Sequence, residues 1–187
     1  MMPSDWVVRF APLISGGGRV LDLACGAGRH ARLLSAGGWR VLAVDRDAAA
    51  VGALLRSGSE SGTASAAIEG LVVDLERDPW PFVAASFDAV VVTRYLHRPL
   101  FPRIVEALRE EGVLIYETFA LGNERYGRPS NPDFLLRPDE LLQAFSPALQ
   151  VVAFEQGLIQ VPAEAVIQRI CAVRSGIGKV SALPLRG

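Results

Sequence analysis

The feature that most constrains this chain is an apolar run that ends in a glycine-containing turn and continues into a helix-like segment. Residues 19–31 read Arg-Val-Leu-Asp-Leu-Ala-Cys-Gly-Ala-Gly-Arg-His-Ala, with one acid, Asp22, inside the apolar run. Gly26 and Gly28 let backbone N–H groups approach a ligand closely, and the start of the following helix adds the positive end of its dipole. The pattern indicates a turn that binds a nucleotide.

Two kinds of nucleotide ligand compete for this turn. Gly26-x-Gly28-x-x-Ala31 alone matches the dinucleotide-binding fingerprint, and Asp45 lies near the distance expected of a ribose-binding carboxylate. A pyrophosphate is anionic, however, and Asp22 would face it with like charge. A ligand with a cationic end suits Asp22 better. S-adenosylmethionine is such a ligand, because it carries a sulfonium and an ammonium and no phosphate.

The whole stretch resembles motif I of the class I S-adenosylmethionine-dependent methyltransferases, in which an acid precedes a Gly-x-Gly-x-Gly turn. Ala24 stands where the first glycine of that pattern normally lies, and its methyl group still permits a tight turn if φ stays negative. A narrower resemblance, to small bacterial methyltransferases of the TehB-like and thiopurine methyltransferase-like group, involves residues 21–30, 116–119 and 131–136.

Strand and helix signals alternate along the chain. We predict strands over residues 19–24, 39–44, 68–73, 87–93, 112–119, 149–154 and 165–173. Helices are predicted over residues 3–15, 29–35, 47–56, 100–110 and 138–145, with Asp47 as an N-cap.

This alternation predicts an α/β fold, in which a single domain over residues 1–187 contains a doubly wound, mostly parallel seven-stranded sheet. The core is expected over 19–174, followed by a short tail, 175–187. Residues 155–164 are too few for a helical crossover, so the last two strands should pair as a hairpin and leave the last strand antiparallel. That ending resembles the methyltransferase fold, a Rossmann-like fold.

Acids mark the expected carboxyl ends of the first three strands, where ligands bind in such sheets. The resemblance implies that Asp45 accepts hydrogen bonds from the ribose hydroxyls and that Asp74 accepts one from the adenine amino group. Val73 and Leu75 would wall the adenine, and Asp22 would lie near the methionine ammonium. The expected cofactor-binding set also contains Ala24, Cys25, Gly26, Gly28, Arg46 and Thr93. A solvated surface position suits Arg46 equally well.

The methyl acceptor should meet the segments after the fourth and fifth strands. Methyltransferases that act on exocyclic base amines carry Asn/Asp-Pro-Pro-Tyr/Phe at this position, whereas this chain has Thr93-Arg94-Tyr95-Leu96. The sequence therefore does not favour methylation of base amines. Residues 120–137 lack periodicity, which favours a lid or binding loop over a partly ordered surface loop. Candidate acceptor contacts are Arg94, Arg98, Arg125, Tyr126 and Arg128.

A thiolate or tellurite acceptor needs no general base, whereas an oxygen or nitrogen nucleophile can use one. His97 and Tyr95 are the available candidates, although His97 also suits a helix start or a packing position.

The composition of the chain limits the kinds of ligand and partner that it is expected to bind. The formal net charge of −1 provides no field that would attract nucleic acid or anionic lipid. His30 and His97, with Cys25 and Cys171, show no metal-ligand spacing, so we expect no metal. The sequence shows no signal-peptide core and no membrane-spanning run, which is typical of a cytoplasmic protein.

We therefore expect methyl transfer to a small-molecule acceptor, without a membrane or nucleic-acid partner. An RNA or protein methyltransferase and a non-catalytic nucleotide-binding module are the alternatives. The sequence does not fix the oligomeric state.

Overall fold

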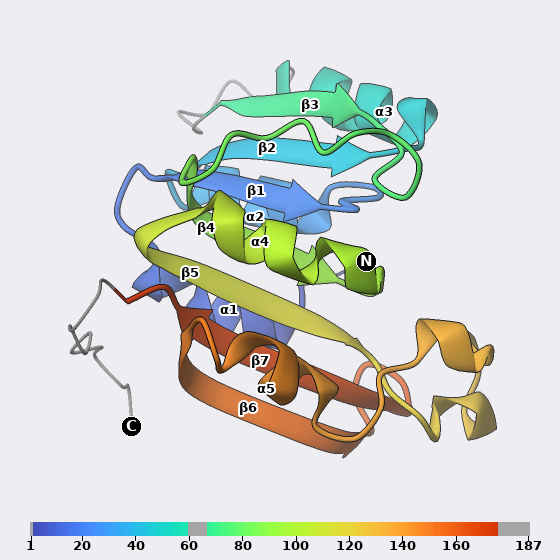
Figure 1. Ribbon diagram of the computed structural model, residues 1–187. Helices are drawn as coiled ribbons and strands as arrows, with labels where there is room; N and C mark the ends of the chain where they lie inside the picture. The colour runs from blue at the N-terminus through green and yellow to red at the C-terminus, as the bar shows by residue number, and fades with distance from the viewer. Residues whose placement is uncertain (1, 60–66, 176–187) are drawn as a thin grey trace.

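A seven-stranded sheet passes through the protein, with helices on both of its faces (Figure 1). The computed structural model describes residues 2–59 and 67–175. The strands are β1 (Arg19–Leu23), β2 (Arg40–Asp45), β3 (Ile68–Val72), β4 (Phe87–Thr93), β5 (Leu108–Phe119), β6 (Gln150–Ile159) and β7 (Ala165–Val173). Their order in the sheet is β3-β2-β1-β4-β5-β7-β6.

The pairing of these strands confirms the predicted fold class. β1 to β5 pair only in parallel with one another, whereas β7 pairs antiparallel with both β5 and β6. β6 and β7 form the expected hairpin, and β6 extends to Ile159, beyond the predicted end at residue 154.

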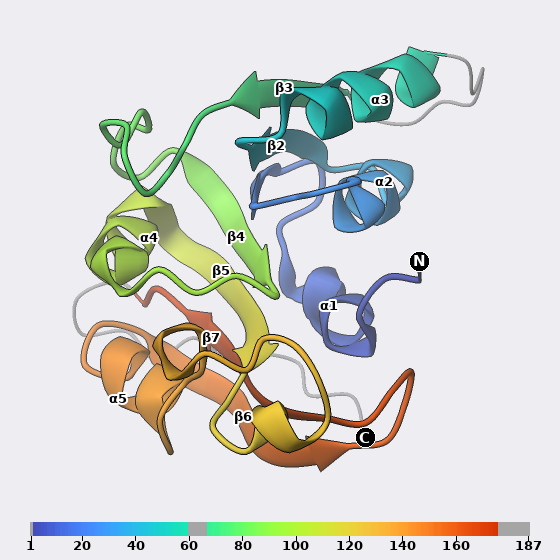
Figure 2. The same ribbon diagram turned by 90° about the vertical axis from the view of Figure 1, so that its right-hand side faces the viewer.

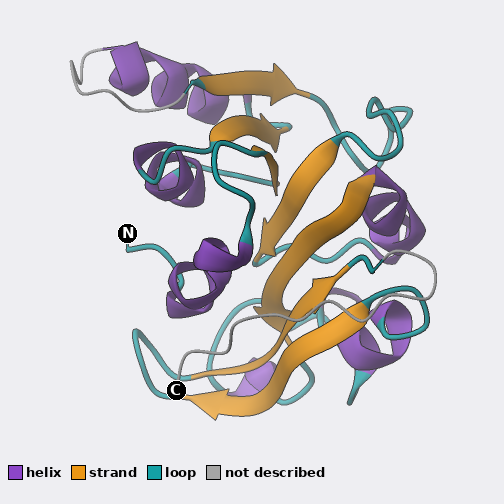
Figure 3. Ribbon diagram, turned by 90° about the vertical axis from the view of Figure 1, so that its left-hand side faces the viewer, coloured by secondary structure: helices purple, strands orange, loops and turns teal. Residues whose placement is uncertain are grey.

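The helices form two layers that cover the sheet (Figure 3). The helices α1 (Asp5–Phe10), α2 (Arg29–Ala36) and α3 (Ala48–Ser59) pack on one face. The helices α4 (Phe101–Ala107) and α5 (Glu140–Phe145) pack on the other. Strand residues alternate between the two cores because successive side chains point to opposite faces of a strand. In β1, for example, Val20 faces α1 and α2, whereas Leu21 and Leu23 face α4 and α5.

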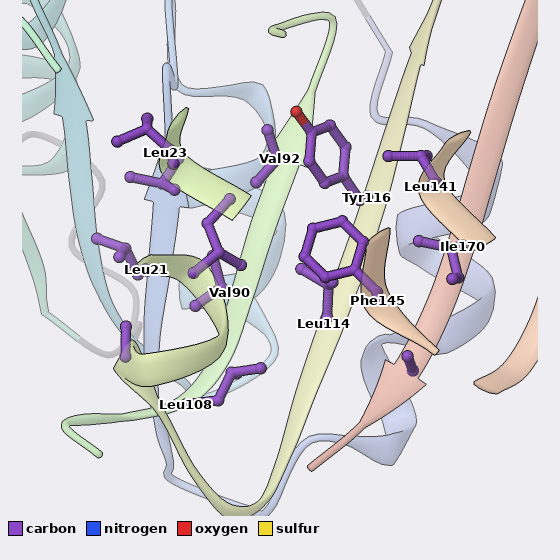
Figure 4. Close-up of a cluster of buried hydrophobic side chains, with 14 of the residues drawn as sticks. Leu21, Leu23, Val90, Val92, Leu108, Leu114, Tyr116, Leu141, Phe145 and Ile170 are labelled. Atoms are coloured by element: carbon purple, nitrogen blue, oxygen red, sulfur yellow. The ribbon is translucent and has the colours of Figure 1, made fainter. Parts of the chain in front are cut away.

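The core beneath α4 and α5 is packed from five strands (Figure 4). Phe145 of α5 lies against Tyr116 of β5, with ring centroids 6.0 Å apart. The Tyr116 hydroxyl donates to the backbone carbonyl of Tyr95, 2.9 Å away, so this buried phenol is satisfied and also holds the chain just beyond β4. The core therefore positions the segment that follows β4.

The crossover from β3 to β4 contains no helix, although parallel strands are usually joined through one. Its aromatic residues cover the sheet instead. The Trp80 and Phe82 rings meet edge to face at 4.8 Å, and Phe82 meets Phe87 of β4 at 5.6 Å.

Several element ends differ from the predictions. The N-terminal helix ends at Phe10 and continues as a 3-10 turn, η1 (Ala11–Leu13), which includes Pro12. The predicted helix over 100–110 is a 3-10 turn, η2 (Arg98–Leu100), followed by α4, which ends at Ala107. Leu108 pairs with Phe87 and already belongs to β5, so the prediction that this strand begins at residue 112 was wrong.

The predicted tail, 175–187, lies outside the described residues except for Ser175.

Candidate cofactor and acceptor site

The carboxyl ends of β1 to β4 meet at one edge of the sheet, which faces the viewer in Figure 2. A pocket of about 270 Å³ opens there. It is lined by Ala24, Asp45, Arg46, Val73, Asp74, Leu75, Glu76, Arg94 and Tyr95. Six of these residues belong to the cofactor set expected from the sequence, and Glu76 is the one that sequence reasoning missed.

The turn after β1 is built from left-handed residues. Ala24, Gly26 and Gly28 have φ of 52°, 52° and 72°, so the turn forms with a positive φ at Ala24 and the condition of a negative φ is not met. The N–H of Cys25 donates to the Val44 carbonyl at 2.9 Å and holds the turn against the end of β2. A Cβ on Gly28 would lie 2.5 Å from the side chain of Leu54, so only glycine lets α2 and α3 pack this closely.

Asp45 connects this turn to the end of β2. Its Oδ2 accepts a hydrogen bond from the N–H of Gly26 at 2.7 Å, and its Oδ1 accepts one from the N–H of Asp47 at 3.0 Å. Each carboxylate oxygen has a second lone pair, so the group can also accept from ligand hydroxyls while it stays fixed by the backbone.

Asp22 is the most unusual group at the site. It is only 1% exposed, and its Oδ2 has no hydrogen-bond partner among the described residues. Burial, and to a smaller extent the charge of Asp45, raises the pKa of Asp22 to about 7, although a hydrogen bond from the N–H of Ala31 and the charge of Arg29 act in the opposite direction. A buried acceptor without a partner is costly, and a cationic ligand group would satisfy it. This oxygen therefore fits the ammonium of S-adenosylmethionine and does not fit a phosphate.

Asp74 both lines the pocket and caps a turn. Its Oδ1 accepts a hydrogen bond from the N–H of Glu76 at 3.0 Å, and its Oδ2 lies 3.9 Å from Nε of Arg77. The side chains of Val73 and Leu75 also line the pocket and pack against the core. The arrangement offers an apolar slot with a carboxylate at its edge.

Tyr95 lies on the same side of the pocket. Burial raises the pKa of its phenol, and the nearby charges of Glu76 and Asp74 raise it further. Tyr95 is therefore neutral at physiological pH, and its hydroxyl lies near the acids expected to hold adenine and ribose. This position favours cofactor contact over general-base catalysis. His97, the other predicted base, is not among the pocket-lining residues.

Five residues that were expected to touch the cofactor do not line the pocket: Asp22, Cys25, Gly26, Gly28 and Thr93. Burial raises the pKa of Cys25 to about 12, and Asp22 and Asp45 add to the effect, so this thiol is unreactive. The Thr93 hydroxyl lies 3.2 Å from Nδ1 of His30.

His30 is at the centre of a polar network that the sequence did not reveal. Its Nε2 accepts a hydrogen bond from the N–H of Ser4 at 3.1 Å, so Nδ1 carries the proton and donates to Thr93. Burial lowers the pKa of His30 to about 4, and the charges of Arg29 and Arg94 lower it further. The Ser4 hydroxyl donates to Glu117 at 2.9 Å, so the network joins the chain before α1 to α2, β4 and β5.

The segment between β5 and α5 is folded on itself and contains two 3-10 turns, η3 (Asn123–Arg125) and η4 (Pro132–Phe134). Buried Asn123 donates to the carbonyl of Pro129 at 3.0 Å and accepts from the N–H of Val166 at 3.2 Å. The segment is thus anchored to β7. The exposed Arg125, Tyr126 and Arg128 lie on it and are not among the pocket-lining residues.

Arg98 serves an internal role in this structure. Its guanidinium forms a bidentate pair with Glu140, at 2.5 and 2.9 Å, and donates to the carbonyls of Asp133 and Leu135 at 2.8 and 2.9 Å. It therefore holds η4 and α5 against the segment after β4, rather than lining the pocket. Of the five predicted acceptor contacts, only Arg94 lines the pocket.

The residues that the structure describes contain no cluster of three or more His, Cys, Asp or Glu able to hold a metal ion. In the same part of the chain, no helix combines the length and the apolar character needed to cross a membrane.

Comparison with known proteins agrees with this geometry. Residues 20–112 match the sequence family described as methyltransferase domain. No curated protein sequence matches the chain significantly.

Solved structures share its fold. TehB from Haemophilus influenzae superposes with a TM-score of 0.77 at 18% identity, over 92% of this chain and 63% of the TehB chain. The chain thus spans less than two thirds of the length of TehB. An S-adenosylmethionine-dependent methyltransferase from Methanosarcina mazei gives 0.72 at 15% identity, over 94% of this chain and 99% of that one.

The [4+2]-cyclase SpnF gives 0.70 at 12% identity, over 91% of this chain and 78% of that one. At these identities the superpositions establish the fold alone. The match to the methyltransferase domain covers the Gly26–Gly28 turn and the strands that carry Asp22 and Asp45. Residues 20–112 thus belong to the methyltransferase-domain family, and the chain has the sheet topology and the turn after β1 that its resemblance to the class I S-adenosylmethionine-dependent methyltransferases implies.

Proposed function

We propose that the protein transfers the methyl group of S-adenosylmethionine to a small-molecule acceptor. The observation that carries this proposal is the pairing of a carboxylate-edged pocket with the unpartnered Oδ2 of buried Asp22. A pocket of about 270 Å³ accommodates a nucleoside-sized group, and Asp22 supplies a counter-charge for a cationic end.

Each residue then has a defined task. Asp45 would accept from the ribose hydroxyls while the backbone N–H groups of Gly26 and Asp47 hold its carboxylate in place. Asp74 would accept from the adenine amino group, with Val73 and Leu75 against the ring. Asp22 would accept from the ammonium. When bound, the cofactor supplies an electrophilic methyl group on a sulfonium, which a nucleophile displaces in line.

The acceptor side supports a small substrate. Tyr95 and Arg94 line the pocket, and the hydrogen bonds of Ser4 to His30 and Glu117 hold the chain before α1 next to the ends of β4 and β5. The segment between β5 and α5 carries both signs of charge, with Glu124 and Asp133 among its arginines. Such a surface does not favour contact with a nucleic-acid backbone.

The proposal is tested in two steps. Calorimetry with S-adenosylmethionine, S-adenosylhomocysteine and NAD should show saturable binding of the first two and none of NAD. Transfer of a labelled methyl group to a pool of small metabolites, and to RNA and protein from the same cells, should then label the small-molecule fraction. Binding of NAD in place of S-adenosylmethionine would contradict the cofactor assignment, and label confined to RNA or protein would contradict the acceptor class.

A further inference from the structure

A second cavity, of about 160 Å³, opens on the β6–β7 hairpin. Its lining includes Gly157, Ile159 and Ile167, together with Glu155 and Arg169. A Cβ built on Gly157 would meet no atom within 4 Å, so the missing side chain leaves open space at this point of β6. None of the tasks assigned to cofactor binding uses this cavity.

A row of paired strand residues connects the second cavity with the cofactor pocket. Gly157 of β6 pairs with Ile167 of β7, and Ile167 also pairs with Phe119 of β5. Paired residues of neighbouring strands project to the same face of a sheet, so the three lie side by side. Beyond them, the guanidinium of Arg94 lies 5.9 Å from the centre of the Phe119 ring, and Arg94 lines the cofactor pocket. Because neighbouring strands lie about 4.8 Å apart, the row from β5 to β6 is about 10 Å long.

The charged residues of the adjacent row neutralise one another. Glu117, Arg169 and Glu155 are paired across β5, β7 and β6. Arg169 lies 2.5 Å from Glu155 and 3.4 Å from Glu117, and Arg9 of α1 lies 3.3 Å from Glu155. Two arginines thus face two carboxylates, and a charged ligand group would have to displace one of these partners. The second cavity therefore favours an uncharged ligand body.

Apolar surface continues from the cavity to the outside of the hairpin. Leu158, which also lines the cavity, is 48% exposed, and Val161 in the hairpin connection is 76% exposed. Apolar surface that borders a cavity and is rimmed by polar groups is typical of a ligand-binding groove.

We propose that the second cavity and the row up to Phe119 form the acceptor-binding groove, and that the methyl acceptor has an uncharged, apolar body about 10 Å long. The reacting atom would lie at the Arg94 end of the row, where the cofactor pocket opens, and the far end of the body would lie over Gly157. This inference rests on the proposed function and adds the chemical class of the substrate.

The probe that we would use is 2-naphthol, because its fused rings are apolar, uncharged at neutral pH and comparable in length to the row. It would be titrated into the protein saturated with S-adenosylhomocysteine, with the polar ring compound myo-inositol as the control ligand. Backbone amide shifts in NMR spectra should saturate at Gly157 and Ile167 with 2-naphthol and stay unchanged with myo-inositol. Nuclear Overhauser contacts of the bound probe with Phe119 and with S-adenosylhomocysteine should place it along the row.

The variant Ile159→Asp should weaken 2-naphthol binding at least tenfold, because it places a charge in the cavity. Ile159→Trp stays apolar and fills the cavity, so it should weaken binding as strongly and serves as the test if the aspartate variant does not fold. Val161→Asp is the matched control, since it makes the same substitution in the same hairpin at a residue outside the cavity lining. This control should bind 2-naphthol within about twofold of the parent, and all three variants should keep the affinity for S-adenosylhomocysteine within about twofold.

The inference is overturned if 2-naphthol does not bind the parent complex, if both Ile159 variants bind it like the parent, or if the bound probe lacks contact with either Phe119 or S-adenosylhomocysteine. A dimer in analytical ultracentrifugation that Ile159→Asp dissociates would also overturn it, because a second copy of the chain would then cover this surface. A failure of S-adenosylhomocysteine to bind the parent protein would appear before the probe is added, and it would count against the proposed function instead.

Discussion

Replacement of Asp22 by Asn should stabilise the free protein at neutral pH and, at the same time, weaken its affinity for S-adenosylmethionine. Asp22 is buried with one oxygen unpartnered, so the folded state pays for its ionisation. Asn keeps the size of the side chain and an oxygen that can accept from the N–H of Ala31, but it removes the charge. A cationic ligand group then loses its counter-charge.

The magnitude follows from the pKa of Asp22, which burial raises from 3.8 to about 7. Because the folded-state pKa is the higher one, the folded protein binds more protons, and its stability falls as the pH rises from 3.8 through 7. At 1.36 kcal/mol per pKa unit, the parent loses about 2 kcal/mol of unfolding free energy from this group between pH 5 and pH 7, and little more above pH 8. Asp22→Asn removes this loss of unfolding free energy, because the amide does not ionise.

Urea unfolding of both proteins at pH 5, 6, 7 and 8 measures the effect. The difference in unfolding free energy between variant and parent should grow by about 2 kcal/mol between pH 5 and pH 7 and level off toward pH 8. Any change in unfolding free energy that the new amide causes equally at every pH cancels, because only the variation of the difference with pH is compared. Calorimetry at pH 8 should show at least tenfold weaker binding of S-adenosylmethionine to the variant. A difference independent of pH, or a variant that binds the cofactor like the parent, would refute the reasoning about this carboxyl group.

The remaining predictions concern the other polar groups of the site. Asp45→Ala should weaken S-adenosylmethionine binding at least tenfold by calorimetry, because two charge-assisted hydrogen bonds of about 1.5–3 kcal/mol each are lost before water compensates; unchanged affinity would exclude Asp45 from the ribose site. Asp74→Leu should cost more affinity than Asp74→Asn, since Asn can still turn its amide oxygen toward the adenine amino group whereas Leu offers no acceptor; equal losses would exclude Asp74 from adenine recognition. The pKa of His30 is lowered from 6.5 to about 4, so the folded state binds fewer protons and His30 contributes stability that is lost as the pH falls from 6.5 through 4. His30→Gln should remove that loss, which urea unfolding at pH 4.5 and 6.5 would detect; identical changes in variant and parent would show that His30 does not titrate in this way. Arg98→Lys should cost about 1–3 kcal/mol in urea unfolding and speed proteolysis between residues 120 and 137, because Lys cannot replace the bidentate pair with Glu140; an unchanged cleavage pattern would contradict the anchoring role of Arg98.

Local sequence patterns were sufficient to predict those features whose physical cause lies in neighbouring residues of the chain. The short side chain of Asp47 predicted a helix N-cap, and its Oδ1 accepts from the N–H groups of Ala49 and Ala50 at 2.9 and 3.1 Å. The alternating strand and helix signals predicted the sheet, and the short connection after β6 predicted the hairpin, because parallel pairing would require a longer crossover.

The predictions were incomplete where a contact with a residue far away in the sequence determines the local structure. Leu108 continues the helical spacing of Ile104, yet it pairs with Phe87 and begins a strand, since tertiary packing overrides periodicity. His30 shows no ligand spacing in the sequence, and its partners Ser4 and Thr93 lie 26 and 63 residues away. No local pattern contains such contacts.

Arg98 illustrates the same limit at the acceptor side. Its position after β4 made it a candidate substrate contact, but Glu140 lies 42 residues further along the chain and neutralises it. A residue's charge can be read from the sequence, whereas the partner that neutralises it depends on the fold.

The distribution of charge around the pocket links these observations to the proposed chemistry. Asp45 and Asp74 line the pocket assigned to the cofactor, and buried Asp22 lies in β1, two residues before the lining residue Ala24. This set of carboxylates would suit a donor with a cationic end, and an anionic nucleophile would be its complement as the acceptor. Methyl transfer between two such groups cancels charge, so exclusion of water from the site favours the reaction. The hydrogen bonds that hold the chain before α1 next to the ends of β4 and β5, and those that anchor the segment after β5 to β7, would then contribute by keeping these segments fixed beside the site.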